Sequence, residues 1–291
     1  MIARIKVEKI SLRGSGVIIL TGPSSCGKGE VAAALCKTLS ISKNRHLSMG
    51  DILRNAFETA KTDAEYAQLL AAKYQISAQA NIFDCVDTAA DLMEKVHKYL
   101  PGLEKYFGRA NMSEFTSQLE WLEFCTVRGL LVPNRWTHTF IAAHIEHRQE
   151  LREKPFILDG YPRTVIAAQQ LLAFLQSMDI PVLKVIHLSI SKQEMLYRAK
   201  LRGRSDDDHE ALLRRYNFYI ENVQPSVDYL KQELGAEAVA LIDAHKPAYD
   251  LIKGEKVFNL KRSIGNVTNT ALRSLGVPRA LIDDLLELDE I

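Results

Sequence analysis

The sequence has few features that would tie the protein to an oxidising compartment or a membrane. Its four cysteines show no C-x-x-C spacing, so we expect reduced thiols in a cytoplasmic protein rather than disulfides. No apolar run approaches the roughly 20 residues that span a bilayer, and we expect no membrane association. Basic residues interrupt each short apolar run of the N-terminal segment, so we expect no signal peptide.

An excess of charge of either sign is also missing. Lys and Arg number 37 and Asp and Glu 36, which gives a net charge of +1. No global field then favours a polyanion, so we expect no nucleic-acid partner, and any phosphate site must be built locally. Hydrophobic residues at 47% and charged residues at 25% are typical of a soluble globular protein. The length of 291 residues allows one or two domains.

Short apolar runs alternate with stretches of helical spacing over much of the chain. The runs that predict buried strands are 17–20, 156–160, 183–190 and 238–243, with a shorter candidate from His46. Alternating strands and helices predict an α/β fold, in which three layers place helices on both faces of a parallel sheet. Ligands of such folds bind at the carboxyl ends of the strands.

Two regions depart from the alternation. From about Lys61 to Arg128 the pattern is almost wholly helical, which predicts an inserted helical subdomain. The tail from Ser263 predicts two short helices separated at Gly276. We therefore divide the chain into three parts. The core consists of residues 1–54 and 129–262, the helical insertion of residues 55–128, and the helical tail of residues 263–291.

The segment "TGPSSCGKGE", Thr21 to Glu30, matches the phosphate-binding pattern G-x-x-x-x-G-K-[ST] except at its last position, where Gly29 stands. The loop follows an apolar strand and opens a helix, so backbone N–H groups and the helix dipole would favour phosphate oxygens. Lys28 would reach the β- and γ-phosphates as a point charge. The alternative is a glycine-rich turn with a solvated lysine, which the strand–loop–helix placement disfavours.

Further blocks follow this loop in order: "HLSMGDILR" at 46–54, "GLLV" at 129–132, "FILDGYPRT" at 156–164, "YRAKLRGRSDDDHEALLRRY" at 197–216, and the less specific "IDAHKP" at 242–247. Together with "GKG", they resemble the adenylate kinases and related nucleoside monophosphate kinases. The resemblance implies a P-loop NTPase-type three-layer αβα core of the short-lid type, with the lid at about 203–208 and the insertion in the acceptor-binding part. It covers roughly Gly16 to Asp243, without the insertion.

The resemblance also implies the residues of the site. Those implied to bind ATP are Ser24, Ser25, Cys26, Gly27, Lys28, Gly29, Glu30, Arg198 and Arg202. Those implied to bind the acceptor are Met49, Gly50, Arg54, Val132, Gly160 and Arg163. The carboxylates implied to hold Mg²⁺ through water are Asp51 and Asp159. The cations implied to act in catalysis are Lys28, Arg163, Arg204 and Arg215.

These residue types suit phosphoryl transfer, which needs an in-line approach, neutralised charge and exclusion of water. A phosphate acceptor is already ionised at neutral pH, so no general base is required, and the eight histidines receive no role. His144 and His147 lie three apart on a predicted helix without a third ligand, which indicates surface or packing residues rather than a metal site.

Four departures from the family pattern limit what the resemblance implies. Glu30 replaces a Thr or Ser beside the donor phosphates, and Met49 replaces a Thr that contacts the acceptor base. Ala167 replaces a Gln that reads adenine, so the acceptor base stays open. The stretch between Arg54 and Gly129 is 75 positions (129 − 54), far longer than in ordinary members. This insertion could cover a larger acceptor, bind a protein partner or only thicken the fold.

We therefore predict an ATP-dependent phosphotransferase that moves the γ-phosphoryl group of ATP to a nucleoside monophosphate with Mg²⁺. One alternative is a related kinase with a bulkier or non-nucleotide acceptor, suggested by the insertion and by Ala167. Another is a non-catalytic nucleotide-binding regulator, in which Glu30 spoils the donor site and the insertion binds a partner.

Overall fold

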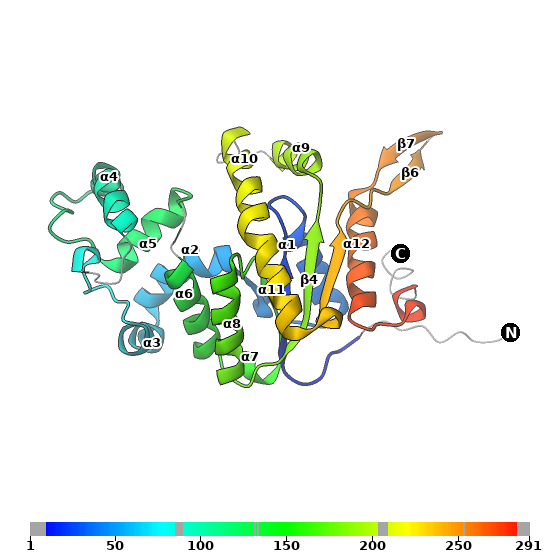
Figure 1. The fold of residues 1–291 in the computed structure, drawn as a ribbon, viewed down its shortest axis with the longest axis horizontal. Coiled ribbons are helices and arrows are strands. Elements are labelled where there is room, and N and C mark those ends of the chain that lie inside the picture. The colour runs from blue at the N-terminus through cyan, green and yellow to red at the C-terminus, as the bar shows by residue number, and fades with distance from the viewer. Residues whose placement is uncertain are drawn as a thin grey trace. The chain divides into compact units, whose positions relative to one another are not determined.

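The computed structural model describes residues 10–84, 90–130, 132, 134–202, 209–252 and 254–283 (Figure 1). The chain divides into two compact units. The first unit consists of Met1–Ser48 and Gln149–Ile291, and the second unit is Met49–Arg148. The predicted lid at 203–208 lies outside the described residues. None of the described helices combines the length and the apolar character that crossing a bilayer requires.

A five-stranded sheet forms the centre of the first unit. Its strands are β1 (Gly16–Thr21), β2 (His46–Ser48), β3 (Pro155–Asp159), β4 (Val182–Ser189) and β5 (Val239–Asp243). They stand in the order β2-β3-β1-β4-β5, and each neighbouring pair is parallel. The predicted parallel sheet is confirmed. Because all strands run the same way, their carboxyl ends, among them Thr21, Ser48 and Asp159, meet at one edge of the sheet.

Helices cover this sheet on both faces, as its apolar strands require. The helices of the first unit are α1 (Lys28–Thr38), α7 (Glu150–Glu153), α8 (Val165–Ser177), α9 (Lys192–Arg202), α10 (His209–Phe218), α11 (Gln224–Leu234) and α12 (Leu260–Ser274). In Figure 1, α8 and α11 lie in front of the sheet and α1 lies behind it. Alternate strand residues such as Ile18, Leu20 and Leu188 pack against α1 and α12 in one buried cluster. The three-layer αβα architecture is confirmed.

The helical spacing from Asp208 to about Gly235 predicts one long helix, and the structure shows an irregular turn within this stretch. Residues Tyr219–Val223 form a π-helical turn between α10 and α11. Pro225 stands in the first turn of α11, where its missing N–H would otherwise break an α-helical ladder. A wider turn accommodates this loss, and hydrophobic spacing alone does not distinguish it from an α-turn.

A small hairpin of the first unit is absent from the sequence prediction. Strands β6 (Tyr249–Ile252) and β7 (Glu255–Phe258) pair antiparallel, with Tyr249 opposite Phe258. Most of its side chains are exposed. Because neither face of the hairpin is buried, its sequence lacks the alternation of apolar and polar residues that predicts a strand. After the hairpin, Asn259 caps α12 by accepting from the N–H of Arg262, and the helix therefore begins at Leu260, before Ser263.

The second unit is built from helices around its own apolar core. They are α2 (Met49–Thr62), α3 (Ala64–Tyr74), α4 (Ala90–Phe107), α5 (Gln118–Val127) and α6 (Asn134–His147). Helix α2 packs against α3, α5 and α6, and α4 packs against α5. Large buried side chains, including Trp121, Tyr66 and Phe140, fill the centre. His147 contacts Asp63, the N-cap of α3, at 2.8 Å, so it joins two helices as a packing residue.

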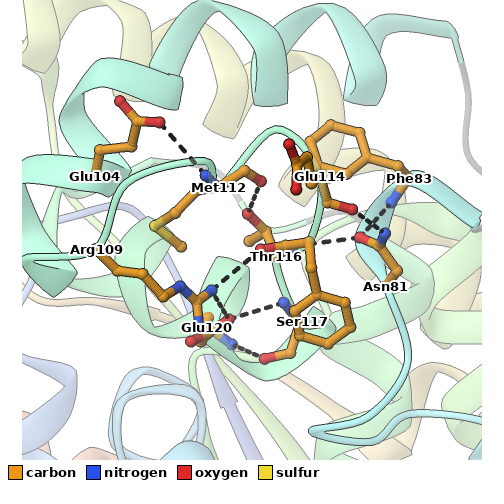
Figure 2. A network of polar contacts seen from close by, with 10 residues as sticks. Asn81, Phe83, Glu104, Arg109, Met112, Glu114, Thr116, Ser117 and Glu120 are labelled. Atoms are coloured by element: carbon orange, nitrogen blue, oxygen red, sulfur yellow. Dashed lines mark hydrogen bonds and ion pairs between the residues drawn. The ribbon is translucent and has the colours of Figure 1, made fainter.

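A polar network holds the loop before α5 (Figure 2). Ser117 and Glu120 form a capping box, in which the Ser117 hydroxyl accepts from the Glu120 N–H and the Glu120 carboxylate accepts from the Ser117 N–H. Arg109 donates both to Glu120 and to the Phe115 carbonyl. Asn81 adds a bond to the Glu114 carbonyl. The loop is therefore fixed by hydrogen bonds where it carries few apolar side chains.

Candidate active site

The loop between β1 and α1 has the backbone conformation of an anion cradle. Gly22 has φ 147°, and a Cβ added to it would lie 2.3 Å from the Leu188 carbonyl oxygen, so only glycine fits. Gly27 is the N-cap of α1 in the left-handed region, with φ 88°. Because glycine has no side chain to accept hydrogen bonds, it leaves the first-turn N–H groups of α1 available to an anion.

The ammonium group of Lys28 lies against this loop. Its Nζ donates to the carbonyl oxygens of Gly22 at 3.1 Å and Pro23 at 2.8 Å, and it lies 3.8 Å from the Cys26 Sγ. These contacts hold one positive charge at the helix N-terminus, where the helix dipole adds to the attraction for an anion. Lys28 and the loop together form a local positive site in a chain with almost no net charge.

The other loop residues differ in exposure. Ser24 and Ser25 are half-buried, and the buried Ser25 Oγ has no hydrogen-bond partner among the described residues. Gly29 and Glu30 are exposed in the first turn of α1. Solvent therefore surrounds the Glu30 carboxylate that replaces the expected hydroxyl residue, and screening weakens its repulsion of a phosphate.

A buried carboxylate stands beside the loop at the end of β3. Asp159 is 8% exposed, and its Oδ2 lies 3.4 Å from the His46 Nε2. The pKa of the buried Cys26 thiol depends on the charges around it. Burial and the charge of Asp159 raise this pKa, whereas the charges of Lys28 and Arg198 lower it. Lys28, Asp159 and Arg198 therefore all lie close enough to Cys26 for their charges to act on it. The raised pKa also means that Cys26 is an uncharged thiol rather than a reactive thiolate.

Arg163 lies next to this carboxylate after the turn that follows β3. Its Nε donates to the Gly160 carbonyl at 3.0 Å, and Gly160 has φ 81°. Desolvation lowers the pKa of its guanidinium, the charge of Asp159 raises this pKa and the charge of Arg215 lowers it. Arg215 of α10 therefore lies close enough to Arg163 for its charge to act on it. Two like charges held close together are stabilised by an anion between them.

Arg198 joins α9 to the loop after β5. Its Nε donates to Glu194 at 2.6 Å, and its Nη2 donates to the Ala244 carbonyl at 3.0 Å. The same Glu194 lies 3.2 Å from the His245 Nδ1. The "IDAHKP" segment therefore meets Arg198, although the two are distant in the sequence. Arg202 is exposed in the last turn of α9.

The remaining predicted residues belong to the second unit or fall outside the described part. In α2, the Arg54 Nη2 donates to the Asp51 Oδ1 at 2.5 Å, and both side chains are exposed. Met49 is buried, and a Cβ on Gly50 would lie 3.1 Å from the Arg54 guanidinium. The other predicted acceptor residue, Val132, is half-buried, and Arg204 lies outside the described residues.

Ala167 lies where the family pattern has a polar side chain, and the structure gives it a packing role. It is 1% exposed in the first turn of α8. Its N–H donates to the Thr164 Oγ1 at 3.1 Å, and its carbonyl accepts from the Tyr161 hydroxyl at 3.3 Å. A methyl group at this position offers a base no hydrogen bond.

The carboxylates of the site fit Mg²⁺ held through water rather than in a protein cage. No group of three or more His, Cys, Asp or Glu side chains that could hold a metal occurs among the described residues. Asp159 is a single hard oxygen donor next to the loop. Mg²⁺ dehydrates reluctantly and commonly binds through one or two carboxylates together with substrate phosphates, which agrees with such a sparse donor set.

The fold and the loop define a class: a parallel sheet of order 2-3-1-4-5 with a glycine-rich loop after its central strand is a P-loop kinase fold. The family model for adenylate kinase matches residues 106–234. The adenylate kinase of Mycobacterium sp. (strain MCS) is 27% identical over 227 residues, which cover 78% of this chain and 92% of that protein. The adenylate kinase of Cyanothece sp. (strain PCC 7425) is 25% identical over 254 residues, which cover 82% of this chain and 98% of that protein.

A third relative, the adenylate kinase of Mycolicibacterium smegmatis, is 34% identical over 116 residues, 40% of this chain and 63% of that protein. The chain is therefore similar to adenylate kinases over most of its length, and the family model matches its central part. It is accordingly an ATP-dependent phosphotransferase of the nucleoside monophosphate kinase type.

Proposed function

We propose that this protein transfers the γ-phosphoryl group of ATP to a nucleoside monophosphate, with Mg²⁺ as cofactor. The observation that carries the proposal is the grouping of Lys28, Arg163 and Arg215 near one buried carboxylate, Asp159. Such a grouping of fixed cations is what phosphoryl transfer asks of a protein, because charge must be neutralised on the moving group. The names of the relatives, all adenylate kinases, support the same reaction.

In this proposal the loop and Lys28 bind the donor. The N–H groups after Gly27 hold phosphate oxygens, and Lys28 exchanges its carbonyl partners for the β- and γ-phosphates. Arg198, held by Glu194 and the Ala244 carbonyl, lies beside the donor base, while Arg202 reaches the donor phosphates. Mg²⁺, held through water by Asp159 and Asp51, would neutralise charge on the donor phosphates.

Arginines bind the acceptor in this proposal. Arg54 and Arg163 bind its phosphate, and Arg204 and Arg215 hold the moving phosphoryl group while the segment 203–208 closes over it. Met49, Gly50, Val132 and Gly160 line the acceptor. We assign the segment 55–128 to covering the acceptor or binding a protein partner, and we leave the base open because Ala167 offers it no hydrogen bond.

A coupled assay of ADP formation tests the proposal directly. The protein is given ATP and Mg²⁺ with AMP, CMP, UMP, GMP or their deoxy forms, beside the Lys28→Ala variant. We expect turnover of at least one acceptor and a loss of roughly 100-fold or more in the variant, since an electrostatic contact made in the transition state is removed. Absence of turnover with every acceptor, from protein with a cooperative melting transition, would disprove it.

A bulkier or non-nucleotide acceptor is the second candidate. The observations that favour it are the buried methyl group of Ala167 and the size of the second unit, Met49–Arg148. ATP consumption that requires a larger phosphorylated acceptor, with none for the eight standard monophosphates, would select this candidate. Nucleotide binding without Mg²⁺ dependence or turnover would instead indicate a regulator.

A further inference from the structure

One buried histidine of the first unit has no role in the proposed reaction, yet it lies beside the phosphate-binding loop. His187 is 4% exposed near the end of β4. In the strand register it is paired with Thr21, the last residue of β1 before the loop. Its ring is therefore fixed to the element that positions Lys28.

The partner of His187 comes from the irregular turn of the long helix. The His187 Nε2 lies 3.0 Å from the Tyr219 hydroxyl. The two rings are nearly parallel, with an interplanar angle of 3° and 5.8 Å between centroids. Tyr219 is 4% exposed and is the first residue of the π-helical turn Tyr219–Val223. The sheet and this turn are thus joined by a buried hydrogen bond and an offset stack.

Both partners of this hydrogen bond are uncharged at neutral pH. Burial, helped by Lys28 and opposed by Asp228, lowers the pKa of His187 to about 4, so the ring is neutral at pH 7. Burial raises the pKa of Tyr219, so its hydroxyl keeps its proton. Gln224 donates to the Tyr219 oxygen at 3.3 Å. The tyrosine hydroxyl can donate to the His187 Nε2, or a protonated Nε2 can donate to the tyrosine oxygen, according to the tautomer of the ring. The buried Nδ1 has no partner among the described residues.

The position of Tyr219 affects the direction of Arg215. Arg215 precedes Tyr219 by four residues, so the two lie on one face of the helix. A π-turn holds one residue more than an α-turn, and each residue rotates the helix by about 100°. The position of the π-turn in the sequence therefore decides which face of α10 is turned toward the phosphate-binding loop. π-turns often occur at functional sites for this reason.

We propose that His187 and Tyr219 are a positioning pair, which holds the π-turn against the sheet and thereby directs Arg215 toward the phosphate-binding loop. The inference rests on the proposed function, in which Arg215 binds the moving phosphoryl group. Neither residue touches substrate in this arrangement. Each acts through Arg215, so their removal should lower kcat more than it changes KM.

The test compares Tyr219→Phe, which removes only the hydroxyl, with Tyr216→Phe, the same change three residues earlier. We expect kcat to fall roughly 10-fold for Tyr219→Phe, with KM for ATP within about twofold, and Tyr216→Phe to keep the wild-type kcat. His187→Leu should match Tyr219→Phe. His187→Gln, whose amide oxygen can accept from the tyrosine, should restore most of the activity.

A double-mutant cycle separates positioning from a general structural effect. In an Arg215→Ala background, Tyr219→Phe should cause no further loss, because the arginine it directs is gone. A kcat of Tyr219→Phe equal to that of the wild type, or the same 10-fold loss in the Arg215→Ala background, would overturn the inference.

Hydrogen exchange supplies a second readout that needs no activity. Amides of 209–218 should exchange faster in Tyr219→Phe than in Tyr216→Phe, with the rest of the first unit unchanged. If the wild-type protein turns over no acceptor, the proposed function fails while this measurement still decides the inference. Equal exchange in both variants would refute the positioning pair.

Discussion

Arg163 and Arg215 come from distant parts of the chain, one after β3 and one on α10, yet the charge of Arg215 acts on the pKa of Arg163. Desolvation lowers the pKa of the Arg163 guanidinium, and the charge of Arg215 lowers it further, against the opposing effect of Asp159. Holding two cations together costs free energy in the absence of an anion. A bound phosphoryl group removes that cost, which is why such pairs suit phosphate transfer.

Arg215→Ala should lower kcat by roughly 10³-fold, because a cation that neutralises the transition state is lost. Its neighbour Arg214 provides a matched control. Arg214 is exposed and pairs with Glu210 at 3.3 Å, so Arg214→Ala should keep wild-type kinetics. Steady-state kinetics of both variants check this prediction, and equal effects of the two substitutions would remove Arg215 from the site.

Glu30→Thr should lower the KM for ATP about threefold at low salt. The substitution removes a negative charge from the first turn of α1, where donor phosphates bind in our proposal. Glu30 is exposed, so screening should shrink the difference as salt is raised. KM measured at low and high ionic strength checks both parts. A KM that rises in the variant would mean that Glu30 helps to bind the donor, for example through Mg²⁺.

His187 should make the protein less stable as pH falls from about 6.5 to about 4. Its pKa is about 4 in the folded chain, whereas the ordinary value is 6.5, so only the unfolded chain takes up a proton in this window. The free energy of unfolding therefore decreases as the pH is lowered, by on the order of 3 kcal/mol between pH 6.5 and pH 4. The groups that face His187 are Lys28, Asp228 and Tyr219.

Urea unfolding followed by circular dichroism measures this dependence. The wild-type protein should lose stability more steeply between pH 6.5 and pH 4 than His187→Gln, which cannot bind the proton. Parallel curves for the two proteins would show that His187 does not titrate differently in the folded and unfolded chains.

Ser117→Ala should destabilise the second unit by on the order of 1 kcal/mol, because it removes the hydroxyl half of the capping box at α5. Ser113, exposed in the preceding loop, offers the matched control Ser113→Ala, which should change stability little. Both tryptophans, Trp121 and Trp136, lie in the second unit, so tryptophan fluorescence reports on its unfolding. An unchanged midpoint for Ser117→Ala would contradict the prediction.

The arrangement of the core could be predicted because its signals are local. Apolar runs such as those around Ile18 and Ile157 predict buried strands, and glycine at positions 22 and 27 predicts a turn that other residues cannot adopt. The exposed hairpin β6–β7 escaped prediction because neither of its faces is buried. The π-turn escaped because its cause is an irregular hydrogen-bond ladder, which the spacing of apolar residues does not reveal.

The sequence by itself determined the class of the protein: a strand, the loop around Lys28, and the arginine-bearing blocks in their order are local patterns that short-range chemistry dictates. Only the tertiary structure decided which of these charges meet. Arg163 comes close to Asp159 and Arg215, and Lys28 and Arg198 both act on Cys26, because parallel strands bring the loops that follow them to one edge of the sheet. Tertiary packing likewise set His187 against Tyr219, since side chains far apart in sequence become neighbours only when helices pack on a sheet.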